Sequence, residues 1–125
     1  MEETGRPISP HFTIWAWDIY GVSSGVNRAT GALLWLGGGG LGLVEIFGGS
    51  GSALSLTQYI GSQAWPIATV FKFGVAFPIV YHYCGGIRHL RWDFFPELLD
   101  TPDAIKSAYL IFGFSVPVAA ALALM

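Results

Sequence analysis

The chain has 125 residues, of which 53% are hydrophobic and only 11% charged, and its mean hydropathy is +0.55. These values exclude an ordinary soluble domain and indicate a membrane protein. The net charge of −2 offers no basic surface for nucleic acid, and the lone Cys84 cannot form an internal disulfide.

The N-terminal segment, residues 1–28, precedes the first long apolar stretch and carries an amphipathic lead-in over residues 6–27. Its aromatic residues are typical of the headgroup level of a bilayer. The first eleven residues show neither an Arg-rich presequence nor a secretory signal with a cleavage site. We therefore expect a mature or directly inserted protein.

Three stretches are long and apolar enough to cross a bilayer, which needs about 20 residues. They run over about residues 29–49, 64–87 and 107–125. The first holds one charge, Glu45, the second holds Lys72, and the third holds none. The sequence thus predicts an all-α membrane protein with three transmembrane helices, forming a single membrane-anchor domain over residues 1–125. A chain this short cannot enclose a bilayer cavity alone, so we expect it to be part of a heteromeric helix bundle.

The first stretch contains four consecutive glycines, residues 37–40. They would weaken a helix in water, but in lipid an unsatisfied backbone group costs several kcal/mol, so we expect the helix to continue. Gly38 and Gly42 form a small-residue face suited to ordinary packing against another helix.

Basic residues fall on one side of the predicted topology. Arg28 precedes the first span, and Arg88, Arg91 and Lys106 lie between the second and third, whereas the connection at residues 48–63 has no Lys or Arg. The positive-inside rule predicts that the N-terminus and the second connection, residues 91–106, face the cytoplasm or matrix.

The inner end of the second span carries the strongest polar cluster: His82, Gly85, Gly86, Arg88 and His89. His82 and His89 share one helix face about 10.5 Å apart. Gly86, four residues after His82, leaves room for a flat group. A haem would use that room, with the His82 imidazole on iron and Arg88 and His89 near its propionates. A hydrogen bond to a neighbouring helix and a proton relay remain alternatives.

This chain cannot supply both axial ligands of one haem iron. Two His residues on the same face of one helix cannot face each other across a metal, and the first and third spans contain no His. A six-coordinate haem would therefore take its second ligand from another subunit.

A second polar group lies at the inner edge of the first span. Ser24 and Arg28 are one helical turn apart, so a hydroxyl and a guanidinium share a face at headgroup depth. They could hold the oxygens of a quinone headgroup or a haem propionate. Equally, Arg28 could extend to lipid phosphate as an anchor.

Other isolated polar residues have simpler interpretations. Glu45 is either solvated or paired with Lys72, whose long stem can also extend outward. Cys84 is interpreted as a packing residue. Asp93 is a candidate to cap the inner loop, pair with a nearby Arg or contact another subunit.

Three motifs in order resemble the large cytochrome b anchor of succinate dehydrogenase, respiratory complex II. Residues 6–11, RPISPH, and 24–31, SGVNRATG, resemble the family signatures RP(L/I)SPH and SxxHRxTG. Residues 82–93, HYCGGIRHLRWD, resemble HxxxGxRHLxWD, and the stretch 72–78 is similar to the mitochondrial branch. The three-span layout agrees, so the resemblance extends over nearly the whole chain.

The resemblance implies a role for each matching residue. His82 stands at the axial-ligand position of haem b, with the other ligand supplied by a small anchor subunit. Ser24 and Arg28 stand at positions lining the ubiquinone pocket, and Arg28 and His89 at positions near the haem propionates. Electrons would arrive from succinate through the flavoprotein and iron–sulfur subunits, so the chain alone is expected to have no activity and no catalytic residue.

One position departs from the family pattern: Asn27 stands where a His usually contacts a propionate. Asn keeps hydrogen-bond donors but cannot carry a positive charge, so we expect a different propionate environment or haem potential. The alternatives are a haem-free structural anchor of the same kind of complex and the anchor of a fumarate reductase. The resemblance implies the mitochondrial inner membrane, with a bacterial cytoplasmic membrane as the alternative.

Overall fold

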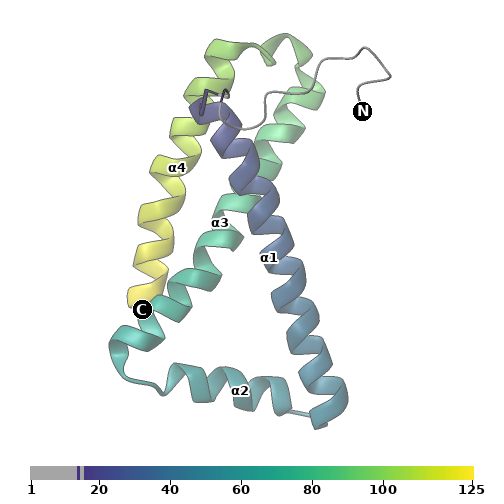
Figure 1. The fold of residues 1–125 in the computed structure, drawn as a ribbon, viewed down its shortest axis with the longest axis vertical. Helices are drawn as coiled ribbons and strands as arrows, with labels where there is room; N and C mark the ends of the chain where they lie inside the picture. Colours follow the sequence, from purple (N-terminus) through teal and green to yellow (C-terminus); the bar gives the residue numbers. More distant parts are fainter. Residues whose placement is uncertain (1–13, 15) are drawn as a thin grey trace, which may run out of the picture.

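The computed structural model describes Ile14 and residues 16–125, and in that part of the chain the long regular elements are helices (Figure 1). In chain order these are α1 (Ile19–Gly48), α2 (Ser52–Gly61), α3 (Trp65–Phe94), the short 3₁₀ helix η3 (Pro96–Leu98) and α4 (Thr101–Leu124). Of these, α1, α3 and α4 are long and apolar enough to cross a membrane. The predicted all-α fold with three spans is confirmed. The predictions for residues 1–13 and Trp15 lie outside the described residues.

The long helices extend beyond the predicted crossings. Helix α1 begins at Ile19 rather than near residue 29, α3 continues to Phe94, and α4 begins at Thr101. A 30-residue helix such as α1 is about 45 Å long, whereas the hydrocarbon core of a bilayer is about 30 Å thick. The apolar stretches therefore mark only the lipid-crossing part of each helix, and residues 19–27 of the lead-in continue directly into the first span.

The connection predicted over residues 48–63 contains a further helix, α2, of 10 residues. The turn before it uses positive φ angles at Gly49 and Gly51, 87° and 88°, which suit glycine. The Glu45 carboxylate accepts hydrogen bonds from the backbone N–H groups of Gly51 (2.6 Å) and Ala53 (2.9 Å). Glu45 thus satisfies amides at the start of α2 rather than pairing with Lys72.

Small residues bring α4 against α3. The face of α4 that is buried carries Ser107, Ala108, Ile111, Ser115, Ala119 and Ala123. Their spacing of mostly three or four residues forms one stripe along the helix, and it lets the two backbones approach closely. On α3, Tyr81 is fully buried, and its ring centroid lies 4.9 Å from that of Phe112 on α4. The core of the chain is therefore centred on the contact between α3 and α4.

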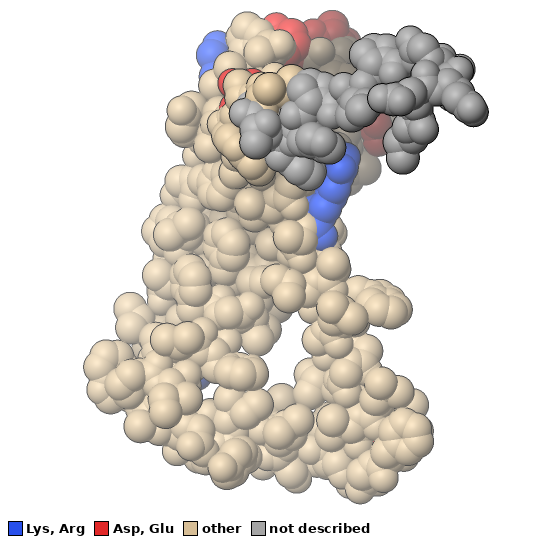
Figure 2. All heavy atoms as spheres, in the orientation of Figure 1, with Lys and Arg blue, Asp and Glu red and all other residues tan. Residues whose placement is uncertain are grey.

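Helix α1 crosses α3 and leaves it toward the α2 end, so that α1, α2 and α3 outline a triangle (Figure 1). Figure 2 shows an opening between these helices in the space-filling view. The buried residues of α1 are Ser23 and Thr30, both in its first half. The glycine run is helical, as predicted, and side chains added at Gly38 and Gly42 would meet open space. Packing of this face against another helix stays a prediction.

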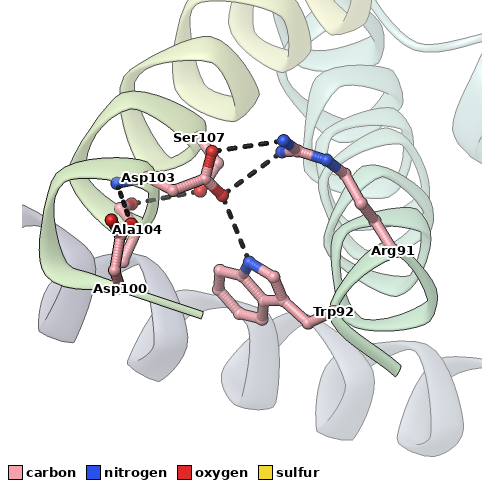
Figure 3. A network of polar contacts seen from close by, with 6 residues as sticks. All are labelled: Arg91, Trp92, Asp100, Asp103, Ala104 and Ser107. Atoms are coloured by element: carbon pink, nitrogen blue, oxygen red, sulfur yellow. Dashed lines mark hydrogen bonds and ion pairs between the residues drawn. The ribbon is translucent and has the colours of Figure 1, made fainter. Parts of the chain in front are cut away.

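Most of the charged residues visible in Figure 2 gather at the end of the molecule where α3 passes into α4. Figure 3 shows the polar network at this junction. Two guanidinium N–H groups of Arg91 donate to the Asp103 carboxylate at 3.2 Å each, and the indole N–H of Trp92 donates to the same carboxylate at 3.2 Å. The Asp100 side chain accepts from the backbone N–H of Asp103 at 2.8 Å and caps α4.

At this junction Asp103, and not Asp93, pairs with a nearby Arg, whereas contact of Asp93 with another subunit stays a prediction. Asp93 is exposed and has no hydrogen bond or ion pair with any residue in the described part of the chain.

We predict that Asp103→Ala lowers the free energy of unfolding by about 1 kcal/mol, because it removes the acceptor of Arg91 and Trp92. The loss is small because Arg91 is 44% exposed, and solvent screens its ion pair with Asp103. Thermal unfolding of the detergent-solubilised protein, followed by helical circular dichroism, measures the change. Asp93→Ala is the matched control, and equal losses in the two variants would contradict the assignment.

Candidate functional site

The two polar groups predicted from the sequence meet where α1 crosses α3. Residues 23–31 of α1 lie against residues 81–88 of α3, and four side-chain hydrogen bonds join the two segments. Segments more than 50 residues apart in the chain therefore form one polar region near the charged end of the molecule.

His82 lies between the two helices and is half-buried. Its ring nitrogen Nδ1 is 2.9 Å from the backbone carbonyl oxygen of Asn27. Because a carbonyl only accepts hydrogen bonds, this contact requires the proton to lie on Nδ1. With that proton on Nδ1, Nε2 is the ring nitrogen left for a metal, and it forms no hydrogen bond within the described residues. That is the tautomer needed to bind a metal through Nε2.

Two glycines allow this close approach. A Cβ atom at Gly31 would lie 2.7 Å from Cε1 of His82, so the imidazole packs against the bare backbone of α1. A Cβ atom at Gly85 would overlap Oδ1 of Asn27 and lie 2.7 Å from its Cγ. The Asn27 side chain therefore occupies the space that Gly85 leaves on α3. Gly86, by contrast, is exposed and faces open space, as expected for a position left free beside His82.

A second contact between the helices was not predicted from the sequence. The hydroxyl of Ser23, fully buried on α1, accepts hydrogen bonds from the Tyr81 hydroxyl at 2.9 Å and from Nη1 of Arg88 at 3.0 Å. The guanidinium carbon of Arg88 also lies 4.9 Å from the centroid of the Trp92 ring. Arg88 is only 5% exposed and has no ion pair within the described residues. It thus brings a positive charge into the contact between the helices.

The sequence did hold a signal for this cluster. Tyr81 and Arg88 are seven residues apart, as are His82 and His89, so each pair shares a helix face. Tyr81 and Arg88 are both buried, whereas His82 is half-buried and His89 is exposed. Sequence reasoning placed Arg88 beside a haem propionate and did not identify its buried bond to Ser23, because that bond depends on the angle at which α1 crosses α3.

A pocket of about 310 Å³ lies beside this cluster. Its lining joins residues of α1, the end of α3 and the start of α4: Tyr20, Ser24, Arg88, His89, Trp92, Leu99, Asp100, Thr101 and Ala104. The structure therefore brings the predicted residues Ser24 and His89 together around one cavity, with the buried Arg88 guanidinium in its wall. His89 is exposed and its ring meets that of Trp92 edge to face, at 5.5 Å between centroids.

Arg28 and His82 do not line this pocket. Arg28 is exposed, and its side chain forms no hydrogen bond with the residues that the structure describes. Adjacent residues of a helix point about 100° apart, so Arg28 turns outward where Asn27 meets α3. Arg28 is thus available to a partner, a ligand or lipid, but it makes no contact that selects among them.

Comparison with known proteins identifies a family for the chain. The family described as succinate dehydrogenase/fumarate reductase transmembrane subunit matches residues 2–122. The chain belongs to this family. The match extends over α1, α3 and α4 as far as residue 122, and it includes both segments of the polar region.

Several relatives are named succinate dehydrogenase cytochrome b560 subunit, mitochondrial. The protein of Sus scrofa is 35% identical over 124 residues, covering 98% of this chain and 72% of the relative. That of Dictyostelium discoideum is 40% identical over 88 residues, covering 70% and 45%, and that of Caenorhabditis briggsae is 32% identical over 123 residues, covering 94% and 64%. The chain thus spans about half to two thirds of the length of the last two.

The buried Ser23 cluster yields a stability prediction. Ser23→Ala removes the acceptor of Arg88 and leaves a buried guanidinium group without its partner, which costs about 1–3 kcal/mol. Ser24→Ala, at the neighbouring position in the pocket wall, should change stability little. Thermal unfolding of the two variants, monitored by circular dichroism in detergent, compares them. A Ser24→Ala variant as unstable as Ser23→Ala would refute the special role of Ser23.

Proposed function

We propose that this chain is the haem b-binding membrane anchor of a succinate:ubiquinone oxidoreductase, respiratory complex II. In this role it anchors the flavoprotein and iron–sulfur subunits at the membrane and forms part of the ubiquinone reduction site. Family membership and the names of the relatives support a succinate dehydrogenase cytochrome b subunit. The finer assignment rests on the geometry of the polar region.

The observation that carries the proposal is the state of His82. Its Nδ1–H is fixed by the Asn27 carbonyl, while Nε2 forms no hydrogen bond in the described part and Gly86 leaves open space one turn away. Metal-bound His residues commonly donate their other ring N–H to a backbone carbonyl in this way. The residues therefore fit haem b: His82 would bind its iron, and Arg28 and His89 would lie near its propionates. When bound, haem b supplies a one-electron carrier near the quinone site.

The pocket supports the quinone part of the proposal. A quinone headgroup carries two carbonyl oxygens, which need hydrogen-bond donors. The Ser24 hydroxyl lines the cavity, and the exposed Arg28 guanidinium lies one turn further along α1. In this proposal Ser24 donates to a quinone oxygen. Arg28, which does not line the pocket, adds positive charge one turn away as negative charge develops on the quinone during reduction.

The proposed partners follow from what this chain lacks. The crossing stretches predicted from the sequence, about residues 29–49, 64–87 and 107–125, contain a single His, His82, so a small anchor subunit would supply the second haem ligand. The oxidation of succinate belongs to the flavoprotein, and no activity is expected of this chain alone. We propose the mitochondrial inner membrane as its location, because the relatives are named mitochondrial, with the N-terminus and the α3–α4 junction on the matrix side.

Two related functions remain as alternatives. A haem-free anchor would keep the fold and the docking role without binding iron at His82. An anchor of a fumarate reductase is the second alternative, because the description of the family names both enzymes. The direction of electron transfer, toward or away from quinone, depends on the potentials of the quinone and the cofactors. The haem assignment depends on His82.

We expect His82→Ala to remove the b-type haem signal from the purified complex, because the variant has no imidazole for the iron. The reduced-minus-oxidised optical spectrum, normalised to flavin content, measures the loss. Cys84→Ala, two residues along the same helix, is the control and should keep the signal. An unchanged spectrum in His82→Ala, or no haem in the unmodified complex, would favour the haem-free anchor.

For the quinone site, we expect Arg28→Ala to slow ubiquinone reduction by about tenfold, through loss of a charge-assisted donor. Succinate oxidation with an artificial dye should stay nearly unchanged, since the dye accepts electrons before the membrane site. Lys106→Ala removes an exposed basic side chain at the same end of the molecule and serves as control. Equal loss of both activities in Arg28→Ala would instead indicate failed assembly.

A further inference from the structure

The hydrogen bond to His82 comes from the backbone of Asn27 and not from its side chain. The same carbonyl also lies 2.9 Å from the hydroxyl of Thr30, which is 3% exposed and bonds to the Val26 carbonyl at 2.8 Å as well. The Asn27 side chain points elsewhere: its Oδ1 is buried and has no hydrogen-bond partner among the described residues. The backbone carbonyl and the side-chain amide of Asn27 therefore have separate roles.

Distance decides whether the carbonyl can reach His82. A backbone oxygen lies close to its own helix axis, so it bonds to a neighbouring helix only where the two backbones come unusually near. Gly31 provides this on α1, because any side chain there would overlap the imidazole. Gly85 provides it on α3, because any side chain there would overlap the Asn27 amide. Both glycines lie within one turn of the hydrogen-bonded pair.

We infer that the Asn27 carbonyl is the orienting acceptor of His82, and that Gly31 and Gly85 are positioning residues that bring it within reach. The Asn27 side chain fills the notch at Gly85 and is dispensable for holding the imidazole. This inference rests on the proposed function, since it concerns how the chain prepares its iron ligand. Fixing the proton on Nδ1 keeps Nε2 available and raises the basicity of the imidazole toward iron.

If Asn27, Gly31 and Gly85 only filled space between the helices, their alanine variants would all have similar effects. The proposed roles predict different effects. Gly85→Ala introduces a methyl group whose three nearest neighbours are the Asn27 amide atoms, so removing those atoms should restore the fit. Gly31→Ala introduces a methyl group against the imidazole itself, so removing the Asn27 amide should not help. Asn27→Ala keeps the backbone carbonyl and should leave His82 oriented.

The test uses the complete purified complex with five variants: Asn27→Ala, Gly31→Ala, Gly85→Ala, and the double variants Asn27→Ala/Gly85→Ala and Asn27→Ala/Gly31→Ala. Gly25→Ala on α1 and Gly74→Ala on α3 are matched controls, because a side chain at either position meets nothing within 4 Å. The rate of haem transfer to apomyoglobin measures retention of the group. The haem midpoint potential and the low-spin ferric electron paramagnetic resonance signal report on the axial imidazole itself.

We expect Gly31→Ala and Gly85→Ala to lose haem at least about tenfold faster than the unmodified complex, the usual scale for loss of a ligand's hydrogen-bond partner. Their midpoint potentials should rise and their resonance signals shift, because a less basic imidazole stabilises ferric iron less. Asn27→Ala and Asn27→Ala/Gly85→Ala should stay within about twofold of the unmodified complex, while Asn27→Ala/Gly31→Ala should remain as defective as Gly31→Ala.

Specific results would overturn the inference. Haem loss in Asn27→Ala comparable to that in Gly85→Ala would assign the role to the side chain, and a normal Gly85→Ala would show that the notch is not needed. Failure of Asn27→Ala/Gly85→Ala to recover, or its failure to assemble, would also refute it. An unmodified complex that contains no haem, or keeps its haem in His82→Ala, would instead overturn the proposed function, so the two failures are distinguishable.

Discussion

The structure depends on how α1 and α3 satisfy polar groups where they cross. At this depth little water is available, so a buried hydroxyl, imidazole or guanidinium must bond to protein. The Ser23 hydroxyl accepts hydrogen bonds from Tyr81 and Arg88, and the Asn27 carbonyl accepts one from His82. These contacts tie α1 to the rest of the chain, which is otherwise built around α3 and α4. The same crossing of α1 and α3 sets the shape of the pocket beside these contacts.

The two ends of the molecule differ in composition, and they therefore differ in the contacts that hold their helices. The end with Arg88, Arg91 and Asp103 is held by directional bonds, and the bonds fix where each side chain points. Beyond Thr30, α1 buries no side chain and carries a run of glycines, so lipid or other chains must surround it there. The polar contacts between the helices are therefore concentrated at one end of the molecule.

Much of the fold could be predicted from the sequence, because about 20 apolar residues in a row have few alternatives to a crossing helix. The ends of the helices could not, since the outer turns are polar and resemble loops; α2 was missed for the same reason. The motifs singled out Ser24 and His89 as polar candidates, and the structure places both around one cavity, a juxtaposition that the sequence did not predict. The burial of Arg88, the outward direction of Arg28 and the use of the Asn27 backbone depend on a crossing angle, and hydropathy and spacing contain no information on that angle.

The fit of Asn27 against Gly85 also has a consequence for how the two helices recognise their alignment. Apolar helices in lipid can slide or rotate past one another at low cost, since their surfaces are nearly uniform. An amide that fits only where α3 lacks a side chain disfavours sliding along the helix, because a slide of one helical turn would bring Tyr81 or His89 beneath it. A substitution in this chain could therefore leave every helix intact and still misalign the pair, with His82 facing the wrong part of α1.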